Sequence, residues 1–157
     1  MNIYKYFQLK IIKVNGQSMS PCLNTNDIVL AKYCMKLTRK DIISFHLPSD
    51  PEKHYIKRII GLPSEFIEFT NSDIIVDGKK IMPNNIDYNK MNTVHSWYLE
   101  PNQFFVLGDN YLDSYDSKSF GPININWVKY KIVSKVWPLG SLSLNNSRTF
   151  FPKDKND

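Results

Sequence analysis

The sequence of this 157-residue chain predicts a mainly β protein. Short runs rich in Ile, Val, Tyr and Phe recur along the chain, and turn residues separate them. No segment keeps an apolar repeat of 3.6 residues, so helices should be few and short. A chain of this length can bury a substantial core, and 42% hydrophobic with 22% charged residues is typical of a globular protein.

Eight strands are expected, at residues 11–14, 27–33, 41–46, 54–60, 66–70, 74–76, 103–107 and 131–137. The dipeptide Asp77-Gly78 predicts a hairpin after the sixth strand, because Gly readily takes the positive φ of a tight turn. One helical turn is expected at residues 125–129. Residues 83–102 are polar and Asn-rich, which predicts a long excursion from the sheet, and the polar tail after Leu144 should fray.

Composition narrows the function classes. Lys and Arg outnumber Asp and Glu by 20 to 15, for a net charge of +5, but the cations are scattered singly, which indicates a solvated surface and no nucleic-acid partner. Such a surface could also attract anionic lipids. The two cysteines, Cys22 and Cys34, match no common metal or redox spacing, so neither a metal nor another cofactor is expected.

The amino-terminal stretch is apolar only in part. Lys5, Lys10 and Lys13 interrupt it well before the roughly 20 residues that a bilayer span needs, so no transmembrane helix is expected in this sequence. A cleavable signal peptide is not expected either, because no apolar core is followed by a small-residue cleavage site.

The first motif with chemical potential is G-Q-S-M-S-P at residues 16–21, directly after a predicted strand. Gly16 allows a tight turn and Pro21 stiffens the exit, so Ser18 would be held at the end of the strand. A serine in such a turn usually has a structural role, and this segment alone does not establish catalysis.

The second motif is H-Y-I-K-R-I-I-G-L-P at residues 54–63. In an alternating strand Tyr55, Lys57 and Ile59 share one apolar face, while Arg58 points to the other side. Burial disfavours a charged amine and lowers its pKa, so Lys57 could accept a proton near neutral pH. The alternative is a lysine at the sheet rim whose amine reaches solvent.

The third motif is an apolar strand that runs into a loop of short polar side chains, F-F-V-L-G-D-N and then S-Y-D-S-K-S-F-G-P. Side chains of this kind often only build turns by bonding to the backbone.

Together the segments V-x-G-x-S-M-x-P, Y-I-K-R-I-I-G-L-P and F-V-L-G-D-N-x-x-x-S-x-D-S resemble the serine, lysine and carboxy-terminal boxes of type I signal peptidases. The resemblance spans residues 12–140 approximately. It implies antiparallel sheets coiled into a partly open barrel, with a short amino-terminal segment at 1–13, a catalytic domain at 14–144 and a polar tail at 145–157.

The resemblance also implies roles for particular residues. Ser18 matches the nucleophile, Lys57 the general base and Ser114 the hydroxyl that orients the lysine amine. Gly16 and Gln17 complete the nucleophile turn, where the backbone N–H of Ser18 would stabilise the oxyanion.

Other positions match structural or substrate-contacting parts of the family. The loop residues expected to be structural are Gly108, Asp109, Asn110, Asp116 and Lys118, and the residues expected to contact an extended substrate are Met19, Pro21, Tyr55 and Ile56. Asp116 would pair with Lys118, where the family usually has Arg, and a lysine cannot form the two-pronged contact of a guanidinium.

The activity implied by the resemblance is removal of signal peptides from exported precursors after small residues, through an acyl-enzyme. The enzyme would be membrane-associated with its active site on the extracytoplasmic or lumenal face, and the sequence does not address its oligomeric state. Family members carry a membrane anchor before the serine box, whereas residues 1–13 here are mixed; Phe7, Leu9, Ile11 and Ile12 could instead contact the lipid interface.

Two alternatives stay open from the residues alone. Repressor-cleaving, self-processing proteases also use Ser/Lys pairs on a β scaffold, and an inactive β module could bind extended peptides without cutting them. A nucleophile elbow of the Ser-His-Asp type is excluded, because Ser20 stands where a second Gly is required.

Overall fold

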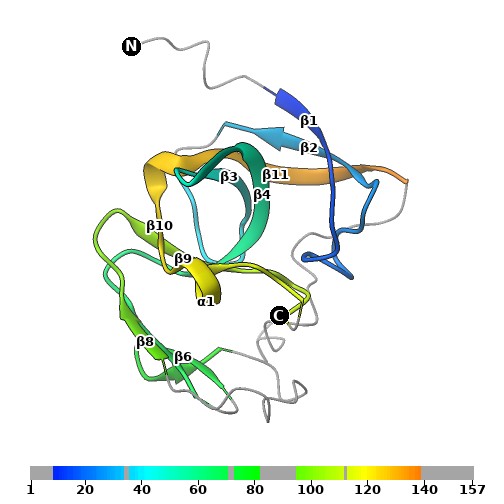
Figure 1. Ribbon diagram of the computed structural model, residues 1–157. Coiled ribbons are helices and arrows are strands. Elements are labelled where there is room, and N and C mark those ends of the chain that lie inside the picture. Colours follow the sequence, from blue (N-terminus) through cyan, green and yellow to red (C-terminus); the bar gives the residue numbers. More distant parts are fainter. Residues whose placement is uncertain (1–8, 34–35, 71–72, 82–94, 112, 139–157) are drawn as a thin grey trace.

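The computed structural model, shown in Figure 1, describes residues 9–33, 36–70, 73–81, 95–111 and 113–138. It confirms a mainly antiparallel β fold, built from a seven-stranded sheet and a four-stranded sheet.

The first sheet has the order β1-β2-β11-β3-β4-β9-β10 and the second the order β7-β6-β5-β8. The strands are β1 (Leu9–Lys13), β2 (Ile28–Lys32), β3 (Ile42–Leu47), β4 (Asp50–Gly61), β5 (Phe66–Phe69), β6 (Ile74–Val76), β7 (Lys79–Lys80), β8 (His95–Tyr98), β9 (Gln103–Leu107), β10 (Ile123–Asn124) and β11 (Val128–Trp137). Helical structure in the described residues is limited to α1 (Ser117–Phe120) and a 3-10 turn, η2 (Ile125–Trp127).

The seven-stranded sheet curls without closing. β11 pairs with both β2 and β3, and its register shifts between Ile132 and Ser134 and between Lys135 and Trp137. Such bulges bend a strand and increase its twist. Because β1 and β10 pair with no further strand of the described chain, the result is the partly open barrel that the family resemblance implies.

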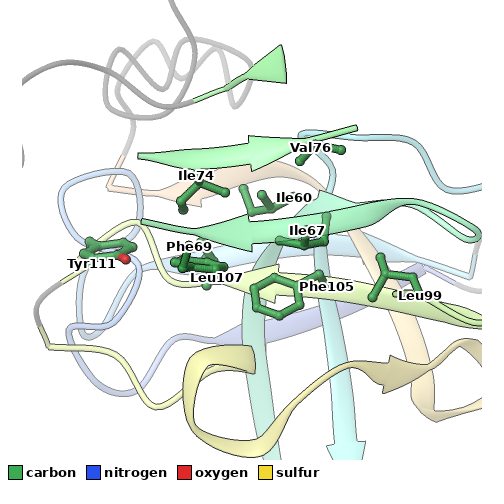
Figure 2. Packing of buried hydrophobic residues seen from close by; sticks show 9 residues of the cluster. All are labelled: Ile60, Ile67, Phe69, Ile74, Val76, Leu99, Phe105, Leu107 and Tyr111. Atoms are coloured by element: carbon green, nitrogen blue, oxygen red, sulfur yellow. The ribbon is translucent and has the colours of Figure 1, made fainter. Parts of the chain in front are cut away.

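The core between the two sheets is apolar. Figure 2 shows side chains of β5 and β6 packed against those of β4 and β9; the buried cluster is Ile60, Ile67, Phe69, Ile74, Val76, Leu99, Phe105, Leu107 and Tyr111. Gly61 permits this approach, since a Cβ there would lie 2.7 Å from Ile67 and from Leu99. Two further apolar clusters are buried, one around Phe45, Tyr55 and Ile59 and the other around Met19, Val29 and Ile132.

Several expectations need correction. The expected excursion from the sheet at 83–102 is wrong for His95–Tyr98, because this segment forms β8 and pairs with β5. The ring of Trp97 packs on the ring of Phe69, with the two centroids 5.6 Å apart, and anchors this otherwise polar segment. β10 and α1 were not expected, and the helical turn expected at 125–129 is the shorter η2, after which β11 begins at Val128. Residues 83–94 and the polar tail lie outside the described residues.

β1 begins at Leu9 and pairs with β2 over its whole length, so the sheet includes residues from the segment 1–13. No helix in the described ranges has the length and apolar character that crossing a bilayer requires.

Candidate active site

The serine turn follows β1 and is closed by its own backbone. Gly16 adopts φ +93°, a conformation that favours glycine. The backbone N–H of Ser20 donates to the carbonyl of Gln17 at 2.9 Å, and that of Leu23 donates to the carbonyl of Met19 at 2.8 Å. These bonds hold Ser18 at the end of the strand, as its sequence position predicts.

Lys57 projects from β4 toward this serine. Its side chain is buried, with the residue 4% exposed, and its Nζ lies 2.5 Å from the Oγ of Ser18. The amine also donates to the backbone carbonyl of Ile56 at 3.0 Å. The structure therefore brings together the two residues that the sequence assigns as nucleophile and base, one in the turn after β1 and the other on β4.

Burial lowers the pKa of Lys57 from its ordinary value of 10.5 to about 8. The carboxylates of Asp116 and Asp109 oppose this shift, while the positive charges of Lys118 and Lys53 reinforce it. A substantial fraction of the amine is thus neutral slightly above physiological pH, and only the neutral form can take a proton from a hydroxyl.

The next residue on β4, Arg58, is also buried but is fully paired. Its Nε and Nη2 donate to the two carboxylate oxygens of Asp109 at 2.8 and 2.6 Å, and Nη1 donates to the carbonyl of Lys40 at 2.8 Å. Arg58 and Asp109 thus tie β4 to the start of the loop after β9. The sequence placed Arg58 on the opposite face from Lys57 but did not indicate that this face is buried too.

That loop supports the site through Asp116, which precedes α1. Its carboxylate accepts from the backbone N–H of Gly108 at 3.0 Å and pairs with the Nζ of Lys118 at 2.8 Å. Lys118 also lies 4.2 Å from the ring centroid of Tyr111. The ion pair expected between Asp116 and Lys118 is therefore present in the structure.

The same loop contacts the serine turn directly. The backbone N–H of Asn110 donates to the carbonyl of Ser18 at 3.0 Å. Gly108 packs so closely on Ser18 and Ser114 that a Cβ there would clash with both. Any side chain at Gly108 would displace the serine turn.

Ser114 does not make the contact that the family resemblance implies. Its Oγ is buried and has no hydrogen-bond partner within the described residues, and Lys57 bonds to Ser18 and Ile56 instead. Ser114 nonetheless lies in the same loop against Gly108. Its assignment as the residue that orients the lysine stays a prediction.

A cleft of about 480 Å³ leads to the serine and lysine. It is bounded by β1 and the serine turn on one side and by the first half of β4 on the other. Asp113 and Tyr115, in the loop between β9 and α1, also line it. Among the expected substrate contacts, Met19, Tyr55 and Ile56 line it. Pro21, which is exposed, does not line it.

The two strands that bound the cleft have open edges. β1 pairs only with β2, and residues 50–57 of β4 pair only with β3 among the described strands. The antiparallel pairings from β1 through β2, β11 and β3 make β1 and β4 run in the same direction. The contributions of Ile12, Val14, Asp113 and Tyr115 were missed, because no sequence pattern shows which strand faces β4.

In the described ranges no three His, Cys, Asp or Glu side chains are grouped so that they could hold a metal ion.

Comparison with known proteins agrees with the motifs. The family model described as signal peptidase, peptidase S26, matches residues 1–137. The chain belongs to this family. Signal peptidase I of Bacillus caldolyticus is 31% identical over 143 residues, covering 80% of this chain and 78% of that protein.

Mitochondrial proteases are also among the proteins to which this chain is similar. Subunit 2 of the mitochondrial inner membrane protease of Saccharomyces cerevisiae is 34% identical over 139 residues, covering 82% of this chain and 68% of its own length. The crystal structure of a signal peptidase I from Enterococcus faecalis superposes with a TM-score of 0.54 and 25% identity, over 65% of this chain and all of that one. This signal peptidase family member is therefore a serine peptidase.

Proposed function

We propose that this protein removes signal peptides from exported precursors by a Ser/Lys mechanism, with Ser18 as nucleophile and Lys57 as general base. The observation that carries the proposal is the 2.5 Å contact between the buried Nζ of Lys57 and the Oγ of Ser18. A lysine whose pKa is lowered to about 8 is matched to proton transfer near neutral pH.

The reaction proceeds in two acyl-transfer steps. The neutral amine of Lys57 takes the proton of Ser18, whose oxygen attacks the scissile carbonyl, and the resulting ammonium returns a proton to the leaving amine. In the second step the amine takes a proton from water, which attacks the ester, and the ammonium then returns a proton to Ser18. The backbone N–H of Ser18 is the proposed oxyanion donor, and Gly16 brings no side-chain hydroxyl to help it.

The substrate is proposed to bind as an added strand in the cleft. The open edges of β1 and β4 offer backbone donors and acceptors on both sides of an extended peptide. The apolar lining beside Ser18 includes Val14, Met19 and Ile56, and of these Val14 and Met19 are buried. A shallow apolar surface of this kind favours small side chains such as Ala at the first and third positions before the cut.

Membrane association is also proposed. Relatives are named as inner membrane proteases, and β1 exposes Leu9 and Ile11 at 63% and 67%. Ile12 is half-buried and lines the cleft, so it is a poor candidate for lipid contact, and Phe7 lies outside the described residues. A flotation assay with anionic vesicles tests this: wild type should float, and Leu9→Gln with Ile11→Gln should remove most of the binding.

The decisive experiment is cleavage of a model precursor with the new amino terminus mapped by mass spectrometry. Wild type should cut after a small residue, and Ser18→Ala should not cut. Ser20→Ala is the matched control: Ser20 belongs to the same turn but does not line the cleft, so this variant should retain most of the activity.

A serine-reactive acylating probe separates a competent enzyme from an inactive peptide-binding module. Labelling should appear in wild type and disappear in Ser18→Ala. Absence of labelling in wild type, with no product from any precursor, would contradict the proposed function. Self-cleavage of the chain during long incubation would instead favour the repressor-type alternative.

A further inference from the structure

A cluster of basic side chains surrounds His54 at the cleft. His54 lies on β4, three residues before Lys57, is exposed and lines the cleft. The imidazole of His46, on the neighbouring strand β3, lies with its ring centroid 4.0 Å from that of His54. The Nδ1 of His46 is enclosed and has no hydrogen-bond partner among the described residues.

Two lysines on other strands of the sheet lie close enough to His54 for their charges to affect its pKa. The pKa of His54 is lowered by desolvation, by His46 and by the positive charges of Lys10 on β1 and Lys129 on β11. Both lysines are exposed, and neither forms an ion pair within the described ranges. Basic side chains from four strands, β1, β3, β4 and β11, are therefore gathered around His54.

The remaining charged residues that line the cleft are Lys13 on β1, Glu52, Lys53 and Lys57 on β4, and Asp113 in the loop after β9. Lys53 lines the cleft and adds a further positive charge, while Glu52 also lines it but makes no ion pair in the described part of the chain. The local balance favours an anion. A metal ion is disfavoured, since the two imidazoles have no third ligand among the described residues and two ammonium groups lie near them.

The position along the cleft relates this cluster to the substrate. This step rests on the proposed function, in which the residues before the cut lie along the apolar stretch next to Ser18. Three residues of strand separate Lys57 from His54, roughly 10 Å. A substrate side chain opposite His54 would therefore stand about four to six residues before the cut.

We propose that His54, backed by His46, Lys10 and Lys129, forms a subsite for an acidic side chain of the precursor, about four to six residues on the amino-terminal side of the cleaved bond. His54 lines the cleft in which the precursor is proposed to bind, and none of the four residues belongs to the exposed apolar face that Leu9 and Ile11 form on β1, which favours the precursor over a lipid headgroup.

The test measures peptide binding to Ser18→Ala protein, so that no cleavage intervenes. Peptides carry a single Glu at the fourth, fifth or sixth position before the cut, with Gln and Lys as matched replacements. At least one Glu peptide should bind about 5-fold more tightly than its Gln partner at pH 6 and low salt, and the Lys peptide should bind more weakly than Gln.

The preference should respond to pH and salt. It should shrink in high salt, which screens the charges of the lysines. It should grow only as the pH falls below 6.5, the ordinary pKa of histidine, because the pKa of His54 is lowered and the imidazole gains its proton late. His54→Gln and Lys10→Gln, each added to Ser18→Ala, should reduce the ratio toward one. Lys79→Gln is the control, because Lys79 is an exposed lysine on the other sheet.

Failure of the subsite and failure of the proposed function give different results. Equal binding of Glu and Gln peptides at all three positions overturns the subsite, even if wild type cleaves the Gln peptides and the proposed function stands. If wild type cleaves no peptide, the proposed function fails, and the binding ratio still decides the subsite. Binding of anionic vesicles that His54→Gln removes, with no Glu preference, would assign the cluster to lipid headgroups and overturn the proposal.

Discussion

Lys57 and Arg58 are neighbouring buried basic residues on β4, but their pKa values shift in opposite directions. Arg58 donates to both carboxylate oxygens of Asp109, whereas the hydrogen bonds of Lys57 within the described residues go to a hydroxyl and a backbone carbonyl. Desolvation alone would lower the pKa of Arg58, but the hydrogen bonds to Asp109 and the charge of that carboxylate outweigh it, so the pKa is raised. The pKa of Lys57 is lowered to about 8, because desolvation dominates there. A direct carboxylate partner thus separates a permanent structural cation from an amine that can exchange its proton.

The largest effect is expected on activity. Lys57→Met should lower the rate of precursor cleavage by about 100- to 10,000-fold, because it removes the general base without changing the size of the side chain greatly. Initial rates on a labelled precursor measure this. Lys79→Met on β7 should leave the rate unchanged; a Lys57→Met enzyme near wild-type rate would contradict the assignment of the base.

The same variant should not lose stability at neutral pH. The amine of Lys57 has a folded pKa of about 8, below its ordinary 10.5, so the unfolded chain binds more protons between these values and wild-type stability rises with pH across that range. Below pH 8 the buried charge is unfavourable, and Met should match or exceed wild type in thermal unfolding. The advantage of Met should shrink as the pH approaches 10.

Removing the partner of Arg58 should have the opposite outcome. Asp109→Asn should lower the free energy of unfolding by about 3–5 kcal/mol, because it leaves a buried guanidinium without its countercharge. Urea unfolding followed by circular dichroism measures the loss. Asp113→Asn, in the same loop but exposed, is the control, and equal stability of the two variants would contradict a buried ion pair.

The pH profile of kcat/KM sharpens the comparison further. The value should rise about tenfold per pH unit below pH 8 and level off above it, because only neutral Lys57 accepts the serine proton. Arg58 should contribute no inflection. A profile that is flat from pH 6 to 10 would exclude a lysine base.

The smallest effect concerns Lys118, whose charge lowers the pKa of Lys57. Lys118→Met should move the inflection of the profile to higher pH, since it removes this repulsion and leaves the Asp116 carboxylate uncompensated. Lys118→Arg keeps the charge and should leave the inflection in place. A shift of equal size in both variants would indicate a change of loop structure instead.

The sequence predicted the fold class and the three segments of the site, because alternating strands and the motif turns are local features. Ser18, Lys57 and the loop at Gly108 each follow or belong to an expected strand, and the structure brings all three together. β8 was missed, since the side chain that holds it, Trp97, is anchored by residues distant in the sequence.

Other features depend on contacts between distant strands. Alternation placed Arg58 opposite Lys57, but only the covering layers decide that both faces of β4 are buried. The cleft walls, the missing contact of Ser114 and the meeting of His54 with Lys10 follow from how the sheet curls. No single segment of sequence carries that information.

The open edges of β1 and β4 have a consequence for the protein in solution when no peptide is bound. A strand edge without a partner is a template for pairing with another chain, so each molecule can recruit a segment of a second copy in place of substrate. Lys10 and Lys13 on β1 oppose such self-association through charge repulsion. Concentrated protein should therefore stay dispersed at low ionic strength and aggregate as salt screens these lysines, and a bound peptide should protect it.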